Sequence, residues 1–93
     1  MRRIEETAGF RRDLRRTKSR SDRRLVAALL ADVISDLRND VPLPARHADH
    51  NLSGRWAGFR DCHVRPDLVL IYRKYDEVLQ LVRLNTHSEL FRK

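Results

Sequence analysis

Histidine is the residue type in this sequence best suited to proton transfer, and four histidines stand in its second half. An imidazole titrates near neutral pH, so it can accept or release a proton under cellular conditions. His50 lies in the loop before an expected strand, His63 ends a strand, and Asp67 follows it across a turn. His87 ends the last expected strand. We therefore expect these four residues to converge in one solvent-open concavity.

The chemistry that such a set favours is cleavage of RNA without a metal. The 2′-hydroxyl must lose a proton to attack the neighbouring phosphate, and the departing 5′-oxygen must gain one. A positioned acid or base contributes roughly 10²–10⁴ in rate. We expect His87 to be the general acid, either His50 or His63 to be the base, and Asp67 to orient a histidine. This mechanism requires no cofactor.

Cationic and aromatic side chains near the histidines favour a phosphate-containing substrate. Arginines can stabilise charge that develops on phosphate oxygens. Those on or beside the same expected strands are Arg60, Arg65, Arg73 and Arg83. Phe91 lies soon after His87 and either stacks on an unpaired base or closes the core.

A metal site is the competing interpretation of the same part of the chain. His47 and His50 are three positions apart, and Asp49 and the other candidates add carboxylate and imidazole ligands. Zinc sites normally show tighter paired spacing and often thiolates, whereas Cys62 is the single cysteine. We therefore expect no metal. A single cysteine also excludes an intramolecular disulfide and fits a reducing cytoplasm.

The net charge of +7 is unevenly distributed. Residues 1–24 contain ten Arg or Lys and four acidic residues, which gives this segment a charge of +6. A basic segment on a small domain favours a polyanionic partner, either nucleic acid or an acidic protein, and the alternative is a solvated face. The basic residues of the first expected helix and the turn after it are Arg11, Arg12, Arg15, Arg16, Lys18 and Arg20.

Two helices are expected in the first half of the chain. Residues 2–6 are compatible with an edge strand, and Thr7 is a suitable N-cap for a short amphipathic helix. The polar residues 19–22 indicate a turn with a second N-cap, and the apolar spacing over 23–37 is helical. Adjacent helices joined by a short polar turn indicate an antiparallel hairpin.

The second half of the chain is expected to form a sheet. Pro42 and Pro44 end the helical region, and residues 45–52 are expected to be a loop. Segments rich in β-branched, aromatic and other apolar residues then predict strands over 55–64, 68–75 and 78–85. Helices followed by strands predict an α+β fold, with an N-terminal helical hairpin packed on one face of an antiparallel β-sheet. We expect a single domain over residues 1–93, with the other face of the sheet free for a substrate.

No part of the sequence predicts export or a membrane span. The basic start is followed by charged residues rather than by an apolar signal-peptide core. The longest wholly apolar run, residues 25–31, is too short to cross a bilayer. We expect a cytoplasmic protein with no membrane partner.

A resemblance to a known family covers slightly more than half of the chain. Residues 42–91 resemble YafQ-type toxins of the RelE/ParE superfamily. The order and spacing of several short matches carry the resemblance: Pro42-Leu43-Pro44, Asp49-His50, Leu52, Trp56, Arg60-Asp61, His63-Val64, Pro66-Asp67, Leu70-Ile71-Tyr72, Thr86-His87 and Leu90-Phe91. Leu68 departs from it, because an aromatic residue is expected at this position.

The resemblance implies a ribosome-dependent mRNA endonuclease that a cognate antitoxin neutralises. It assigns the active site to His50, His63, Asp67 and His87, with Phe91 in support, and it leaves His47 outside. If so, the basic N-terminal segment is expected to bind ribosomal RNA phosphates while the histidines act on mRNA.

Two other functions are compatible with the sequence. One is a toxin of related fold that binds DNA gyrase without cutting RNA, against which the set of histidines argues. The other is a noncatalytic basic RNA-binding module. Substitution of His87 separates an enzyme from such a module, because a pure binder keeps its effect.

Overall fold

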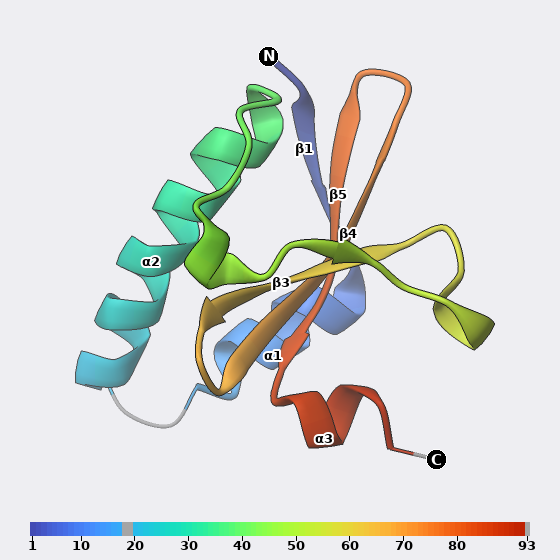
Figure 1. Cartoon of the computed structure of the whole chain (residues 1–93). Helices are drawn as coiled ribbons and strands as arrows, with labels where there is room; N and C mark the ends of the chain where they lie inside the picture. Colours follow the sequence, from blue (N-terminus) through green and yellow to red (C-terminus); the bar gives the residue numbers. More distant parts are fainter. Residues whose placement is uncertain (18–19, 93) are drawn as a thin grey trace.

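A five-stranded sheet forms the centre of the protein, flanked by helices (Figure 1). The computed structural model describes residues 1–17 and 20–92, without the side chains of residues 20 and 21. The principal elements are β1 (Arg3–Glu6), α1 (Ala8–Arg15), α2 (Arg20–Arg38), β2 (His50–Asn51), β3 (Arg60–Arg65), β4 (Leu68–Tyr75), β5 (Val78–Asn85) and α3 (His87–Leu90). Two short 3-10 turns, η1 (Ala45–His47) and η2 (Gly54–Trp56), precede β3.

The sheet is mixed rather than wholly antiparallel, which corrects the expectation for its topology. Its strand order is β1-β5-β4-β3-β2. The meander from β2 to β5 is antiparallel, but β1 pairs with β5 in parallel, with Arg3 opposite Val78 and Glu6 opposite Leu81. A tight turn can join only antiparallel neighbours, whereas the long connection between β1 and β5 permits the parallel pair. The expected α+β class is confirmed.

Helix α1 closes the edge of β5 that extends beyond β1. Thr7 caps the helix by accepting a hydrogen bond from the Phe10 backbone N–H at 3.0 Å. The Thr7 hydroxyl also donates to the Val82 carbonyl at 2.6 Å, and the Asp13 carboxylate accepts from the Leu84 backbone N–H at 2.9 Å. Side chains of α1 therefore satisfy strand groups that would otherwise stand unpaired at a sheet edge.

The two N-terminal helices pack on different strands. α1 lies against β5, and α2 lies chiefly against β3. In Figure 1, α2 flanks one side of the sheet and α1 passes behind its lower part. The turn that was expected to join the helices includes residues 18 and 19, which lie outside the described residues. Among the described residues, no helix is long and apolar enough to cross a membrane.

Apolar side chains cover both faces of the sheet. The larger cluster joins Phe10 and the buried face of α2 to side chains such as Leu70 and Tyr72 of β4. A smaller cluster on the other face joins Val69 and Ile71 to Leu90 of α3, with partly buried side chains from residues 52–59 packed against it. The face expected to be free for a substrate is therefore partly occupied by α3 and by the segment before β3.

The predicted strand bounds are confirmed for β4 and β5 and are wrong at the start of β3. β3 begins at Arg60 rather than at residue 55, because η2 occupies Gly54–Trp56. Gly58 follows with a φ of +92°, a conformation that favours glycine and interrupts extended backbone. The expected loop over 45–52 contains η1 and the two-residue strand β2, and α2 is longer than the predicted 23–37.

Candidate active site

A buried carboxylate, Asp61, lies among three of the histidines. Asp61 is on β3 opposite His50 of β2, and His63 is two positions further along β3 on the same face. His50 Nδ1 lies 3.0 Å from Asp61 Oδ1, and the Asp61 side chain is only 1% exposed. The charge of Asp61 also interacts with His63 and with His87 at the start of α3. The structure thus places Asp61 in contact with His50 and within electrostatic range of His63 and His87.

The environment of Asp61 opposes its ionised form. Burial raises the pKa of the carboxyl above its ordinary value, and the positive charges of His50, His63 and His87 act in the opposite direction. Neither carboxylate oxygen has a hydrogen-bond partner within the described part of the chain, because the close His50 nitrogen lacks hydrogen-bond geometry toward it. Such a carboxylate is costly for the fold and is therefore a candidate functional group.

Backbone carbonyls orient the histidine rings of the loop and of β3. His50 Nδ1 lies 2.7 Å from the Ala48 carbonyl, and His63 Nδ1 lies 3.3 Å from the Pro66 carbonyl. A carbonyl only accepts hydrogen bonds, so each Nδ1 carries the proton and donates it. In the neutral ring, the lone pair then lies on Nε2, as a general base requires.

His47, which was left outside the expected set, is buried behind the site. Its side chain is 8% exposed, and its Nδ1 lies 2.6 Å from the backbone carbonyl of His63. This contact fixes η1, and with it the loop that leads to His50, against β3. The contact between His47 and the His63 carbonyl lies next to an irregularity in the pairing of β3 and β4 between His63 and Arg65. His47 therefore connects the backbones that carry two of the candidate catalytic histidines.

The third histidine of the group, His87, begins a short helix and touches an aromatic ring. Thr86 caps α3 by accepting from the Glu89 backbone N–H at 3.2 Å. The rings of His87 and Phe91 have centroids 4.6 Å apart and planes inclined at 45°. One turn of helix therefore presents His87 and Phe91 together to solvent.

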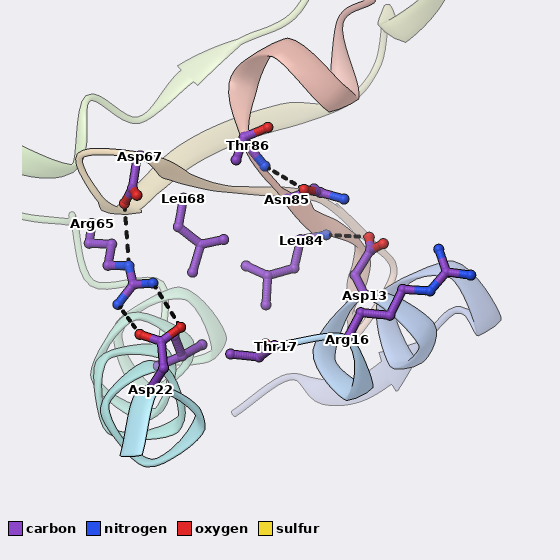
Figure 2. Close-up of a pocket in the computed structure, with 11 residues that line it drawn as sticks. Asp13, Arg16, Thr17, Asp22, Arg65, Asp67, Leu68, Leu84, Asn85 and Thr86 are labelled. Carbon is purple, nitrogen blue, oxygen red and sulfur yellow. Dashed lines mark hydrogen bonds and ion pairs between the residues drawn. The ribbon is translucent and has the colours of Figure 1, made fainter. Parts of the chain in front are cut away.

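Asp67 lies apart from the contacts that connect the histidines. Its side chain is 78% exposed, and it contacts Arg65 at 3.3 Å. Figure 2 shows Asp67 at the rim of a separate pocket between the helices and the β3–β4 turn, with Asp22 and Thr86 also lining it. No hydrogen bond or ion pair joins Asp67 to a histidine among the described residues. Asp67 is thus close to the site in the fold, since Thr86 precedes His87, but its ion pair is with Arg65.

The arginines expected to bind phosphate are each held by protein groups. Arg60 contacts Asp49 and donates to Asn51 at 2.6 Å. Arg65 donates to both oxygens of Asp22, at 2.8 and 3.2 Å. Arg83 donates to the buried Asp13 at 2.7 Å, which gives it a part in fixing α1.

Arg73 differs from the other three because aromatic rings hold it. It donates from Nε to Gln80 at 2.6 Å, and its guanidinium lies 5.3 Å from the Phe59 ring and 4.9 Å from the Tyr75 ring. These contacts fix the position of a cation on β4, and none of the ion pairs in the described part of the chain neutralises it.

The basic cluster of α1 is the surface formed by Arg11, Arg12, Arg15 and Arg16, all of which are exposed. Lys18 and the side chain of Arg20 lie outside the described residues. Arg16 lines the same pocket as Asp67 and Thr86 (Figure 2). The basic cluster therefore approaches the end of β5 from which α3 and His87 start, although the two are far apart in sequence.

Asp61 is the site residue that the sequence analysis missed. It stood in the run of family-like residues, but no role was expected for it. The alternation of a strand offered a usable signal, because residues two apart on β3 share a face and Asp61 precedes His63 by two. An acidic residue that shares a strand face with a candidate base, as Asp61 does with His63, indicates a site residue more strongly than the next carboxylate along the chain, Asp67.

Residues 2–92 match the family described as bacterial toxin of type II toxin-antitoxin system, YafQ. A Haemophilus influenzae relative described as a candidate YafQ toxin is 44% identical over 85 residues, which cover 86% of this chain and 82% of the relative. An mRNA interferase toxin YafQ from Escherichia coli is 38% identical over 89 residues, which cover 95% of this chain and 94% of that protein.

Solved structures show the same fold. The crystal structure of YafQ from Escherichia coli BL21(DE3) has a TM-score of 0.84 at 36% identity and covers 98% of this chain and 99% of that one. The toxin of the Escherichia coli DinJ-YafQ complex has a TM-score of 0.81 at 37% identity, with 97% of each chain covered. A metal-bound toxin from Helicobacter pylori has a TM-score of 0.83 at 36% identity, and the match covers 98% of this chain and 100% of that one.

Proposed function

Because the chain belongs to the YafQ family of toxins from type II toxin–antitoxin systems, we propose that it cuts mRNA with its histidines and without a metal. The protein is an mRNA interferase toxin, as its Escherichia coli relatives are named. The observation that best supports the chemistry is the contact of His50 with the buried Asp61, whose charge also interacts with His63 and His87.

The proposed reaction is an internal transfer of the phosphate. Nε2 of His50 or His63 accepts the proton of the 2′-hydroxyl, and the 2′-oxygen forms a bond to the adjacent phosphorus. The bond from phosphorus to the 5′-oxygen breaks, and His87 gives that oxygen a proton. The products are a 2′,3′-cyclic phosphate and a 5′-hydroxyl.

Charged neighbours of the histidines complete the proposed mechanism. The negative charge of Asp61 stabilises the imidazolium that the base becomes when it takes the proton. Arg73, held on the open face of β4, contributes positive charge to the phosphate oxygens. Asp67 acts from the rim beside Arg65, where its own exposed carboxylate can meet the substrate or the ribosome.

The partner that the relatives support is an antitoxin, since a complex of toxin and antitoxin is known for the Escherichia coli protein. We propose an acidic segment of the antitoxin as the complement of the basic cluster of α1. In the free toxin, the same cluster binds phosphates of ribosomal RNA in the cytoplasm, which places the histidines over the mRNA.

The test of the proposed function is cleavage of mRNA on programmed ribosomes in the presence of a chelator. We expect cleavage to persist in EDTA and to yield a 2′,3′-cyclic phosphate or its 3′-phosphate product. We expect it to stop when the ribose at the cut lacks its 2′-hydroxyl. Loss of cleavage in EDTA that zinc, copper or magnesium restores would contradict the metal-free mechanism. That outcome matters because a related Helicobacter pylori toxin binds a metal. Within the described residues, no group of three or more His, Cys, Asp or Glu side chains is arranged to hold one.

A further inference from the structure

A pocket of about 210 Å³ lies beside the histidine site and shares Phe91 with it. It is lined by Ser53, Arg55, Trp56, Leu90, Phe91 and Arg92. We propose that this pocket binds one unpaired base of the mRNA, next to the phosphate that is cut. The inference rests on the proposed function and deepens it by naming a subsite for the substrate.

The walls of the pocket offer flat apolar surface. Trp56 is held edge-to-face against Phe59, with ring centroids 5.5 Å apart and planes at 89°. Phe91 is held against the ring of His87. Leu90 is buried between the two sides as part of the small cluster on this face of the sheet. Unpaired bases bind to proteins by stacking on aromatic rings of this kind.

The rim of the pocket carries positive charge on both sides. Arg55 is exposed, and its guanidinium lies 5.9 Å from the centre of the Trp56 ring. Arg92 is also exposed and donates to Glu89 at 2.8 Å. A surface ion pair of this type is weak and can open to a phosphate. The charge of the rim therefore fits the backbone on either side of a bound base, whereas it does not fit a cationic peptide.

The pocket is continuous with the candidate active site. Phe91 lines the pocket and touches His87, so a base stacked there has its own ribose and phosphate near the proposed acid. Leu68, at the position where an aromatic residue was expected, packs against the helix-side core instead. Trp56 and Phe91 are thus the aromatic pair available to a base on the open side.

The indole N–H of Trp56 also lacks an acceptor. Nε1 is buried and has no hydrogen-bond partner within the described part of the chain. A buried donor without a partner is destabilising. A small rotation of the ring toward a base carbonyl would supply the missing acceptor, which gives the pocket a preference for bases over uncharged apolar groups.

Trp56 is the single tryptophan of the chain, so its fluorescence reports on this pocket alone. The probe is a short single-stranded RNA with 2′-O-methyl riboses, which cannot be cut by the proposed mechanism. An abasic oligonucleotide with the same number of phosphates is the matched probe. We expect the RNA to quench Trp56 and the abasic oligonucleotide to leave its emission unchanged. Equal effects of both probes, or no effect of either up to millimolar concentration, would overturn the proposal.

Variants locate the two halves of the interaction. We expect Phe91→Ala to weaken binding of the RNA by roughly ten- to a hundredfold, as loss of one stacking ring does. We expect Arg55→Gln to reduce the slope of log Kd against log salt by about 0.7, as loss of one phosphate contact does. The control is Arg3→Gln, which makes the same change of charge at an exposed position of β1 and should bind the RNA with the affinity and salt dependence of wild type. If Phe91→Ala, folded by circular dichroism, binds as tightly as wild type, the pocket is not the base site.

The same fluorescence measurement tests the antitoxin as the occupant. Emission that changes on addition of the antitoxin but never on addition of RNA would overturn the proposal and assign the pocket to an antitoxin side chain. Cleavage by the wild-type protein on ribosomes is measured separately. A failure of that cleavage argues against the proposed function, whereas intact cleavage without base-dependent quenching argues against the pocket alone.

Discussion

Asp61→Asn is the substitution that most directly tests the grouping of the histidines around a buried charge. The change removes the negative charge and keeps the size of the side chain. At 3.0 Å from His50 Nδ1, the Coulomb energy with an effective dielectric of 20 is about 5.5 kcal/mol. The His50 side chain is 55% exposed, so solvent screening reduces that figure to roughly half. We therefore expect cleavage to slow by about 30- to 160-fold, the equivalent of ~2–3 kcal/mol in the barrier.

The same substitution should raise the stability of the fold at neutral pH. Burial raises the pKa of Asp61, so the folded state favours the protonated carboxyl. The stabilisation from that proton is present below the unfolded pKa of about 4 and is lost as the pH rises through the higher folded pKa. At pH 7 the wild type therefore carries the cost of a buried charge that the asparagine variant avoids, by about 1 kcal/mol. At pH 3 the difference should disappear.

The assay combines single-turnover cleavage on programmed ribosomes with urea unfolding at pH 7 and pH 3. Asp32→Asn, the same change at an exposed position of α2, is the matched control and should leave both quantities unchanged. If Asp61→Asn cuts within twofold of wild type and unfolds at the same urea concentration, Asp61 neither supports the histidines nor strains the fold.

Three further substitutions test the surroundings of the site. Replacing all four arginines of the basic cluster of α1 with glutamine should weaken ribosome association and flatten its salt dependence, whereas His87→Ala should leave association intact. If the four-glutamine variant binds ribosomes like wild type across a salt series, the cluster is only a solvated face. His47→Ala should lower the free energy of unfolding by about 2 kcal/mol and slow cleavage, because it frees the loop before β2 from β3. An unchanged urea midpoint would contradict the role of His47 in holding that loop. Asp67→Asn should slow cleavage. It should change the free energy of unfolding by less than about 0.5 kcal/mol, because the carboxylate is exposed. Full activity in that variant would show that Asp67 is not part of the site.

Local sequence patterns predicted the elements that depend on local physics. Runs of β-branched, aromatic and other apolar residues, separated by the short polar pair Asp76-Glu77, predicted the bounds of β4 and β5, because neighbouring strands of a hairpin share one short connection. Thr7 was predicted as a cap, and it is one. The parallel pairing of β1 was not predictable in this way, since it depends on a partner about 75 residues later in the chain, as the contact of Thr7 with Val82 shows.

The sequence pointed to the histidines of the candidate site, whereas it did not point to the buried carboxylate of Asp61. His50 begins β2, His63 lies within β3 rather than at the expected strand end, and His87 begins α3 just after β5. Asp67 was chosen because a hairpin turn separates it from His63 by four positions, but the turn directs it toward Arg65. Whether a side chain at a turn points toward one face or the other depends on the local twist and on the irregularity between β3 and β4, which the sequence pattern does not reveal.

The parallel pair of β1 and β5 also determines when the protein can fold during its own synthesis. Arg3–Glu6 have no partner strand until Val78–Leu81 have been made, and Asp13 waits for Leu84. Closing so long a loop is entropically costly and slows folding. The nascent chain therefore leaves the ribosome with its edge open, and His87 follows β5. The sheet, and with it the start of α3 that carries His87, can therefore be completed only after β5 has been made.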